Sequence, residues 1–473
     1  MKRVVFEPIK TPKGHYIYDR SVNTIFSVSP DEYEEFKRLK QDDNEIEQSP
    51  IVQYYRRKGL LRENNVSIIR HPSTELLPHY CENRLNYMIL QVTQQCNLRC
   101  SYCAYSGLYY NRQHNSQRMS FETAKKAIDF FIQRTAESHY LRLGFYGGEP
   151  LLEFDLIKKC VAYIKDKVEG RDVTFVTTTN GTLLTDEKIK FLAENNFHLM
   201  ISLDGSKAEH DACRVFPNGQ GSFDIIMKNL RRVRELYPDY AKTINISTVI
   251  SPKADLNDTL EYFKSDDFLS DRYITMNPIA DVGLKEQVNY QESFHLVRKY
   301  EYFKYLLYLL KKIDREYVSD LVIASEYNME NTYRALKRHS ILPSCTCPGG
   351  PCIPSVKKLF VTVNGDFYPC EKLSESNTCA KIGSLKDGFD LKSMESVLNI
   401  GTLSEEECKN CWALPLCKIC IVKIEHKDGQ QEFTKADKQS ACRHTRSTSR
   451  ADLYEACVLH ELGYSPAEEE IIL

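Results

Sequence analysis

The sequence lacks the features that mark membrane-spanning and exported proteins. No stretch of its 473 residues approaches the about 18 consecutive apolar residues that a membrane span requires. The first ten residues, MKRVVFEPIK, have no apolar core of the kind found in a signal peptide. We therefore expect a cytoplasmic protein with no membrane partner.

An excess of charge of one sign is also missing. The chain has 63 Lys and Arg against 65 Asp and Glu, which gives a formal net charge of −2. Proteins that bind nucleic acid through their overall charge are basic, so we expect no nucleic-acid partner. The sequence contains no internal repeat and no low-complexity tract, and its length allows about three domains at roughly 150 residues each.

Cysteine, by contrast, is unusually frequent. Of the 17 cysteines, three lie at positions 96, 100 and 103, and eleven lie between positions 345 and 457. Cytosolic thiols stay reduced, so such groups indicate metal binding or redox chemistry rather than disulfides. The scattered Cys81, Cys160 and Cys213 are interpreted as small buried apolar residues.

Residues 1–82 are predicted to form a small first domain. HYIYDRSVNTIFSV (15–28) predicts two short strands joined by a turn-prone segment. Pro30 and the acidic residues after it favour the start of a helix, and IVQYYRRKGLL (51–61) predicts a second helix that ends at Gly59. Strands followed by small helices suggest a winged-helix-like module.

Residues 83–340 alternate between predicted strands and helices. Six apolar segments predict strands, at 87–93, 141–146, 173–178, 198–203, 244–250 and 273–279, and capped helices begin at Ser120, Thr185 and Ser222. The apolar strands predict an α/β fold with a parallel sheet buried on both faces. We expect a partial (β/α)6 TIM-like barrel, with a flat doubly wound sheet as the alternative. In both, ligands bind beyond the carboxyl ends of the strands. Segment 293–317 predicts one long amphipathic helix, or two, with its Tyr, Phe and Leu side chains in the core.

Residues 341–473 are rich in cysteine and show few long periodic segments. We therefore expect bound metal to supply much of the folding energy of this third domain. Within it, KKLFVTVNGDFYPC (357–370) predicts a β-hairpin that turns at Asn364 and Gly365.

The first cysteine group directly follows the first strand of the central domain. Cys96, Cys100 and Cys103 have the spacing C-x3-C-x2-C. Three thiolates in one loop can hold three irons of a cubane cluster and leave the fourth iron open to another ligand. Structural zinc is the alternative, but it normally takes four closed ligands, and the next candidate, His114, lies eleven residues further on.

This spacing resembles the signature of the radical S-adenosylmethionine (SAM) superfamily, in which Tyr102 matches the aromatic residue before the third cysteine. The resemblance implies a [4Fe-4S] cluster whose open iron chelates SAM. Reductive cleavage of SAM then yields a 5′-deoxyadenosyl radical that abstracts a substrate hydrogen. An external electron donor of the flavodoxin or ferredoxin type is implied as a partner.

Further segments resemble cofactor-binding segments of the same superfamily. GFYGGEP (144–150) resembles the GGEP segment that contacts the amino group of SAM, and TTTNG (177–181) is expected near the ribose. SLDG (202–205) and HDACR (210–214) complete the match, in which Ser202 and Arg214 would hold the cofactor carboxylate. The resemblance thus implies these cofactor-binding residues: Tyr102, Gly147, Gly148, Glu149, Thr179, Asn180, Ser202, Asp204 and Arg214.

The later cysteines resemble the seven-cysteine SPASM domain found downstream of radical SAM cores, although the family's last C-x3-C spacing is here Cys417-x2-Cys420. The resemblance implies two auxiliary [4Fe-4S] clusters. One would be bound by Cys408, Cys411, Cys417 and Cys442. The other would be bound by Cys352, Cys370 and Cys420, with either Cys345 or Cys347 as fourth ligand. A zinc ribbon formed by Cys408, Cys411, Cys417 and Cys420 is the alternative.

Taken together, the chain resembles cysteine-rich-peptide maturases, which form thioether crosslinks from a cysteine sulfur to a carbon atom in ribosomally synthesised precursor peptides. The first domain then resembles the module that binds the precursor's leader, which would add as an edge strand. Three alternatives remain. They are a sulfatase-maturing enzyme that generates formylglycine, a maturase that forms carbon–carbon bonds or epimerised residues, and a non-catalytic zinc or iron–sulfur scaffold.

Overall fold

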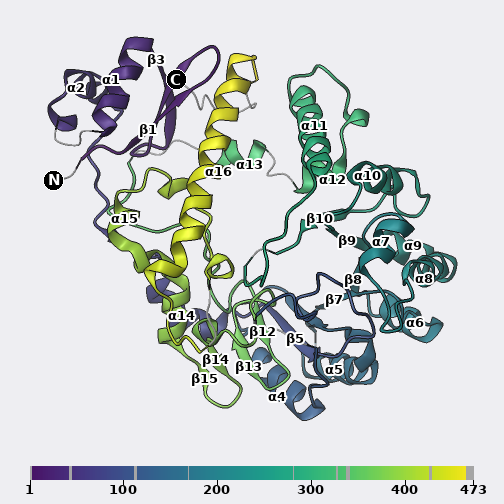
Figure 1. Cartoon of the computed structure of the whole chain (residues 1–473). Coiled ribbons are helices and arrows are strands. Elements are labelled where there is room, and N and C mark those ends of the chain that lie inside the picture. Colours follow the sequence, from purple (N-terminus) through teal and green to yellow (C-terminus); the bar gives the residue numbers. More distant parts are fainter. Residues whose placement is uncertain are drawn as a thin grey trace.

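In the computed structural model, a ten-stranded sheet forms the centre of the chain (Figure 1). The structure describes residues 3–41, 45–110, 114–168, 170–280, 282–325, 329–336, 341–425 and 429–464. Six consecutive parallel strands make up the larger part of the sheet: β5 (Tyr87–Thr93), β6 (Leu141–Gly147), β7 (Val173–Thr179), β8 (His198–Ser202), β9 (Asn245–Ile250) and β10 (Ile274–Pro278). These strands neighbour one another in chain order. A doubly wound sheet reverses its order at a switch point, so this order is that of a barrel, and the sheet is curved and open (Figure 1).

Helices cover the outer face of this sheet. They are α4 (Phe121–Ile132), α5 (Phe154–Lys167), α6 (Asp186–Glu194), α7 (Lys207–Cys213), α8 (Phe223–Leu236), α9 (Pro238–Lys242) and α10 (Leu256–Ser265). The side chains of Ser120 and Thr185 cap α4 and α6 by accepting hydrogen bonds from backbone N–H groups, as predicted. Ser222 precedes α8, but its hydroxyl donates to the carbonyl of Arg214 instead of capping the helix.

The prediction that both faces of the sheet are buried is wrong for β7 and β9. In β7, Phe175, Thr177 and Thr179 are buried, whereas the residues between them are only half-buried. β9 shows the same alternation. The reason is that the helices cover only the outer face, so side chains on the concave face of the open barrel stay partly accessible.

The long helix after the barrel also differs from its prediction. α11 (Glu292–Leu309) buries Phe294, Glu301 and Tyr305, but Leu296, Tyr300 and Phe303 are exposed. The helix contacts its neighbours along one side only, so much of its aromatic character lies outside the core. Three short elements follow, η4 (Arg315–Tyr317), α12 (Asp320–Ser325) and α13 (Met329–Ala335).

The N-terminal module is a three-stranded antiparallel sheet with two helices. The strands β1 (Phe6–Lys10), β2 (His15–Asp19) and β3 (Thr24–Val28) are followed by α1 (Pro30–Gln41), η1 (Ile46–Gln48) and α2 (Pro50–Arg57). The prediction missed β1. One face of the sheet packs on α1 and α2 through an apolar cluster that includes Ile17, Phe26 and Phe36.

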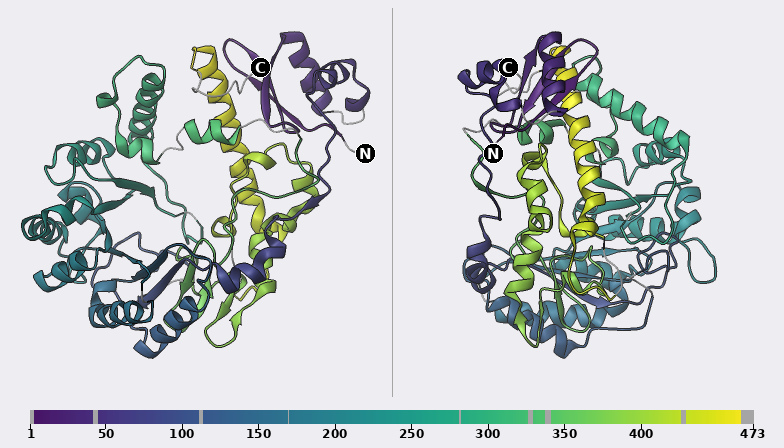
Figure 2. Two further views of the ribbon diagram at one scale, coloured as in Figure 1. Left: turned by 180° about the vertical axis from the view of Figure 1, so that it is seen from behind. Right: turned by 60° about the vertical axis from the view of Figure 1, so that its left-hand side comes forward.

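The opposite face of the module packs against the C-terminal helix α16 (Lys435–Glu461), as both views in Figure 2 show. Tyr16, Tyr18 and Ile25 share an apolar cluster there with Leu453 and other α16 residues. Arg450 of α16 also forms an ion pair with the buried Glu7 of β1. The module is therefore docked on the cysteine-rich part of the chain.

The C-terminal hairpin extends the barrel sheet. β12 (Leu359–Val361) and β13 (Asp366–Tyr368) turn at Gly365, whose φ of +86° suits glycine, so the predicted hairpin is confirmed. β12 lies parallel to β5, and β14 (Gly383–Ser384) and β15 (Gly388–Phe389) complete the sheet. The central and C-terminal parts thus share one sheet, and the predicted boundary after residue 340 falls at residues 337–340, outside the described residues.

Several short elements connect these parts. They are β4 (Ile68–Ile69), which pairs with β11 (Cys345–Thr346), η2 (Thr74–Leu76), α3 (Leu77–Asn83), η3 (Pro150–Glu153), η5 (Thr378–Ala380), α14 (Leu391–Leu398), η6 (Ile400–Ser404), α15 (Glu405–Lys409), η7 (Leu414–Leu416) and η8 (Ile421–Lys423).

The 27-residue helix α16 contradicts the prediction of little regular structure near the C-terminus. Its sequence does carry a start signal, a capping box between Thr434 and Asp437, and its residues include neither Gly nor Pro. Its apolar residues are too sparse to give a clear helical stripe. Among the described residues, no helix is both long enough and apolar enough to cross a membrane.

Candidate functional site

The loop that carries Cys96, Cys100 and Cys103 begins where β5 ends, at the carboxyl edge of the parallel strands. Cys100 is buried and the other two are half-buried. The backbone N–H of Leu98 donates to Cys96 Sγ and that of Tyr105 donates to Cys103 Sγ, both over 3.4 Å. Such N–H groups stabilise negative charge on sulfur, as cluster-bound thiolates require.

Burial favours the protonated form of Cys96 and Cys100 by raising the pKa of each thiol. Burial, with smaller contributions from Glu149 and the neighbouring cysteines, raises the pKa of Cys96 to about 12. Burial likewise raises the pKa of Cys100 to about 11, against the opposing effect of Arg214. A bound metal centre must therefore displace these protons, which couples metal binding to proton release.

The donor set suits a cluster better than a single ion. In the described part of the chain, no three His, Cys, Asp or Glu side chains are grouped as ligands of one metal ion. His114, the further zinc candidate, instead lies beside Tyr105, with 5.9 Å between ring centres. Three thiolates that each bind a different iron do not need to converge on one point. The all-sulfur loop therefore fits a cubane cluster.

Gly147 and Gly148 bring the end of β6 directly against the segment that leads into the cysteine loop. A Cβ atom on Gly147 would lie 1.9 Å from the carbonyl oxygen of Thr93, and one on Gly148 would lie 2.1 Å from that of Gln95. The N–H of Gly148 donates to the Thr93 carbonyl over 2.9 Å. Only glycine allows this approach of the two backbones.

Glu149 lies at the same edge, but its carboxylate is occupied by the chain itself. It is 1% exposed. Oε1 accepts hydrogen bonds from Thr179 Oγ1 (2.6 Å) and the N–H of Leu151 (3.0 Å), and Oε2 accepts from the N–H of Asn180 (2.8 Å). Burial raises the pKa of this carboxyl group. Glu149 thus ties the ends of β6 and β7 together, and its contact with SAM stays a prediction.

Asn180 links the end of β7 to the cysteine loop. Its Nδ2 donates to Asn97 Oδ1 over 2.9 Å and lies 3.9 Å from Cys96 Sγ. Asn180 is therefore a neighbour of the first cysteine, while the expected position of the TTTNG segment near the ribose stays a prediction.

A buried ion pair lies on the other side of the loop. Arg214 donates through Nε and Nη2 to the two oxygens of Asp204, over 2.8 and 3.2 Å. Its Nη1 is 3.9 Å from Cys100 Sγ, and its guanidinium carbon is 5.3 Å from the centre of the Tyr102 ring. The Tyr102 hydroxyl donates to Asp204 as well. The carboxylate held by Arg214 in this structure is thus that of Asp204, while Ser202 ends β8 half-buried.

Sequence reasoning missed a polar group beneath the loop. Gln91, fully buried in β5, donates through Nε2 to the hydroxyl of Tyr105 over 3.0 Å, and that hydroxyl donates to Glu375 over 2.5 Å. A glutamine within an otherwise apolar strand was the signal that could have revealed Gln91. Its partner Glu375, far along the sequence, carried no such signal.

The second cysteine group is the predicted ligand set of Cys408, Cys411, Cys417 and Cys442. Cys408 and Cys411 are electrostatic neighbours of both Cys417 and Cys442, and burial raises the pKa of Cys417 to about 12. The ammonium of Lys438 lies 3.2 Å from Cys408 Sγ. A cavity of about 280 Å³ adjoins this group and is lined by Cys442, Ser404, Glu407, Lys435, Gln439, Arg443 and Arg446.

The remaining predicted ligands form pairs. Cys345 is an electrostatic neighbour of Cys347, and Cys420 is one of Cys370, whose pKa burial raises to about 11. Cys352 is exposed. Cys442 is an electrostatic neighbour of Cys408 and Cys411, whereas Cys420 is one of Cys370, and both the cluster set and the zinc-ribbon set stay predictions. The fourth ligand of the set formed by Cys352, Cys370 and Cys420 stays open between Cys345 and Cys347.

Comparison with known proteins agrees with this geometry. The family model for the radical SAM superfamily matches residues 90–263. The cysteine-type anaerobic sulfatase-maturating enzyme of Clostridium novyi is 27% identical over 345 residues, which are 71% of this chain and 87% of that protein. The radical SAM cyclopropyl synthase TigE of Paramaledivibacter caminithermalis is 24% identical over 434 residues, which are 84% of this chain and 81% of that protein.

Solved structures share the fold. Native anSMEcpe with bound AdoMet has a TM-score of 0.54 at 21% identity and covers 78% of this chain and 99% of its own. The same protein with bound AdoMet and the Kp18Cys peptide has a TM-score of 0.53 at 22% identity, over 77% of this chain and 99% of its own. The matched segment, residues 90–263, contains the three-cysteine loop and the buried pair beside it, and this segment is a radical SAM superfamily domain.

Proposed function

We propose that this protein is a radical SAM maturase that installs a thioether crosslink, from a cysteine sulfur to a carbon atom, in a ribosomally synthesised precursor peptide. The observation that carries the proposal is the loop of Cys96, Cys100 and Cys103 at the carboxyl ends of the barrel strands. When bound there, a [4Fe-4S] cluster and SAM together supply a 5′-deoxyadenosyl radical that abstracts a substrate hydrogen.

The chain's own residues would hold and orient that cofactor. The backbone of Gly147 and Gly148 borders the loop, and Asn180 lies beside Cys96. Arg214 lies beside Cys100. Asp204 takes its Nε and Nη2, and its Nη1 would donate to the cofactor carboxylate. Tyr102 covers the same guanidinium. These residues form the proposed SAM site, with Glu149, Thr179 and Ser202 at its edge.

The cysteines of the C-terminal part support a maturase with two auxiliary clusters. Cys408, Cys411, Cys417 and Cys442 would bind one, and Cys352, Cys370 and Cys420, with Cys345 or Cys347, the other. Residues 341–473 would then constitute the SPASM domain, and residues 83–340 the radical SAM barrel. Reduced thiolates of this kind suit a cytoplasmic location, and a flavodoxin- or ferredoxin-type donor would supply electrons.

The module of residues 1–82 supports a peptide substrate with a leader. In its sheet, β1 and β3 are the edge strands, and β1 contacts α16 through Glu7 and Arg450. A leader peptide would therefore add to β3, with main-chain hydrogen bonds providing affinity. The structural match covers 99% of anSMEcpe but only 78% of this chain. This chain therefore has residues beyond those that anSMEcpe contains.

Formylglycine generation is the second candidate. The sulfatase-maturating names of relatives such as the Clostridium novyi enzyme favour it. The similarity to a cyclopropyl synthase favours carbon–carbon bond formation as a third candidate, with epimerisation as a related outcome. All of these share the proposed radical SAM site.

The core chemistry is tested with protein reconstituted anaerobically with iron and sulfide. Reduced protein is expected to cleave SAM to 5′-deoxyadenosine and methionine, and a variant with Cys96, Cys100 and Cys103 all changed to Ala is expected to lose this activity. Cys160→Ala is the matched control, since Cys160 is buried in α5 away from the loop. Absence of cleavage by protein with verified iron content would leave the scaffold alternative.

The product is decided by co-expressing this protein with a short cysteine-rich precursor peptide and measuring the peptide by mass spectrometry. A thioether removes two hydrogens per crosslink and leaves the cysteine resistant to alkylation. Formylglycine formation removes the sulfur, carbon–carbon bonding leaves the thiols reactive, and epimerisation leaves the mass unchanged. A precursor without its leader is expected to remain unmodified.

A further inference from the structure

A buried lysine stands beside the second cysteine group. Lys438, in the first turns of α16, is 1% exposed. Its Nζ donates to Ser404 Oγ (2.9 Å), to the carbonyl oxygen of Gly401 (3.3 Å) and to Cys408 Sγ (3.2 Å). Within the described ranges of the chain, this ammonium forms no ion pair with a carboxylate. Burial of a charge is strongly unfavourable unless an opposite charge lies close to it.

The carboxylate that acts on Lys438, that of Glu407, is half-exposed and paired with Lys435, so an opposite charge in direct contact with the ammonium arises when the cysteines bind a metal centre. Neutral thiols offer the ammonium one weak acceptor, whereas four thiolates on a [4Fe-4S] cluster carry a net negative charge. Lys438 is also an electrostatic neighbour of Cys417 and Cys442, so it faces three of the four sulfurs. The position of Lys438 therefore fits an anionic cluster held by this group.

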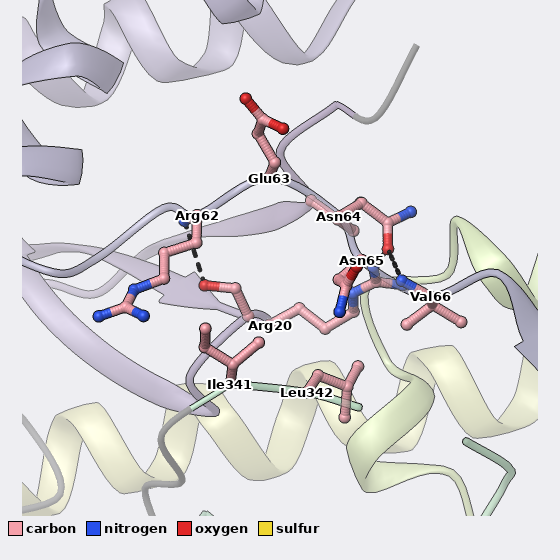
Figure 3. Close-up of a pocket in the computed structure, with 10 residues that line it drawn as sticks. Arg20, Arg62, Glu63, Asn64, Asn65, Val66, Ile341 and Leu342 are labelled. Carbon is pink, nitrogen blue, oxygen red and sulfur yellow. Dashed lines mark hydrogen bonds between the residues drawn. The ribbon is translucent and has the colours of Figure 1, made fainter. Parts of the chain in front are cut away.

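Two arginines add to the positive surroundings. Arg446, two turns further along α16, acts on both Cys411 and Cys442. Arg20 of the N-terminal module is fully buried and donates through Nη1 to the carbonyls of Lys409 (2.6 Å) and Cys411 (3.2 Å). Figure 3 shows Arg20 at a small pocket of about 10 Å³, room for about one water molecule. This cysteine group is thus enclosed by cations from two separate parts of the chain.

The other two cysteine groups have different neighbours. Cys96 lies near the carboxylate of Glu149, and Cys370 lies near that of Glu371, although Lys358 is also close to Cys370. Cys100 faces both members of the Arg214–Asp204 pair. Glu407 likewise lies near Cys442, so the feature that distinguishes the group around Cys408 is a buried ammonium at 3.2 Å from a cysteine sulfur.

We propose that Lys438 raises the reduction potential of the auxiliary cluster bound by Cys408, Cys411, Cys417 and Cys442. One-electron reduction by an external donor makes the cluster more negative by one charge, and a buried ammonium at hydrogen-bond distance from a ligating sulfur stabilises that state. The inference rests on the cluster assignment of the proposed function, but not on the peptide product.

The test uses the full-length chain with Cys96, Cys100 and Cys103 changed to Ala, so that only the two auxiliary clusters, about eight iron atoms, remain. Their potentials are measured by electron paramagnetic resonance during anaerobic redox titration with dithionite. In Lys438→Met, the equilibrium constant for reduction of one cluster is expected to fall at least tenfold, which is 59 mV for one electron. The other cluster is expected to keep its potential.

Lys435→Met is the matched control. Lys435 lies one turn earlier on α16, is 55% exposed and pairs with Glu407, so solvent screens its charge. Its removal is expected to shift neither potential by as much as 59 mV. Lys438→Gln, which keeps an N–H donor but removes the charge, is expected to behave like Lys438→Met if the charge is responsible.

Clear outcomes would overturn the proposal. Unchanged potentials in both Lys438→Met and Lys438→Gln, with iron content unchanged, would do so. Retention of all iron in Cys408→Ala would also do so, because the assigned cluster would then lie elsewhere. Loss of about four irons in Lys438→Met but not in Lys438→Arg would support the charge role, whereas loss in both would show a packing role instead. None of these readings depends on SAM cleavage or on peptide modification.

Discussion

The hydroxyl of Tyr105, two residues beyond Cys103, donates a 2.5 Å hydrogen bond to the carboxylate of Glu375, five residues beyond Cys370. Gln91 of β5 donates to the same hydroxyl. The loop proposed to bind the SAM cluster is thereby fixed to the cysteine-rich part of the chain by a polar network below the protein surface. Buried networks of this kind hold one arrangement because breaking any member leaves polar atoms without partners.

Tyr105→Phe is expected to weaken the attachment between these two parts. It removes one hydrogen bond from the Gln91 amide and one from the Glu375 carboxylate, which still contact each other, and the loss of a bond to a charged group costs about 1–3 kcal/mol. The thermal midpoint of the reconstituted protein should therefore fall, measured by circular dichroism under anaerobic conditions. Tyr110→Phe is the control, because Tyr110 is 60% exposed. Equal midpoints for the two variants would contradict the structural role of Tyr105.

Arg214→Met is expected to destabilise the protein far more than removal of an exposed arginine. Breaking a buried ion pair leaves the Asp204 carboxylate uncompensated, which costs about 3–5 kcal/mol. Arg232, which pairs with Asp186 on the surface, is the matched control, and its change to Met should cost no more than about 1 kcal/mol.

Chemical denaturation measures these differences. The double variant Arg214→Met with Asp204→Asn should recover part of the loss, since no charge then remains buried without a partner. If the double variant loses more unfolding free energy than the two single variants lose together, the two residues do not act as a buried ion pair.

Gly148→Ala is expected to disturb the cysteine loop and to lower both iron content and SAM cleavage. The added Cβ would lie 2.1 Å from the backbone oxygen of Gln95, so one of the two chains must move. Gly349→Ala is the control. The nearest atom to its added Cβ, the carbonyl oxygen of Cys417, lies at an ordinary contact distance of 3.7 Å, so this variant should keep its iron and its activity. Normal iron content and cleavage in Gly148→Ala would show that the close approach is not required.

His210 is expected to make the protein sensitive to mild acid. Burial lowers its pKa to about 3, and its Nδ1 accepts a hydrogen bond from the N–H of Asp204. Because the unfolded chain binds the proton near pH 6.5 and the folded chain does not, the stabilisation is complete above pH 6.5. It declines as the pH falls toward 3, with a loss of about 2 kcal/mol at pH 5.

The measurement is the thermal midpoint between pH 7.5 and pH 5, compared with that of His210→Gln. The variant should show a shallower dependence on pH because the titrating ring is gone. His79→Gln, at a half-exposed site paired with Glu137, should retain the slope of the unmodified protein. A slope that is the same in all three proteins would contradict the assignment to His210.

Local sequence signals were sufficient for most of the barrel. The six predicted strands agree with β5 to β10 within two residues at each end, because runs of apolar residues, Ser or Thr caps and glycine turns act over short distances. The same holds for the hairpin at Asn364 and Gly365. α16 and β1 were missed because their apolar residues are few and interrupted by polar ones, so each is stabilised by packing on the other rather than by its own pattern.

The cysteine spacings by themselves determined that this chain carries candidate cluster ligands and which loop holds the first three. Only the tertiary structure decided which residues surround them, since Glu149 with Asn180, Asp204 with Arg214, and Lys438 with Cys408 come from separate elements. The physical reason is that a ligand motif needs only neighbours in sequence, whereas the charge and hydrogen bonds around buried sulfurs depend on which strands and helices meet at the same place.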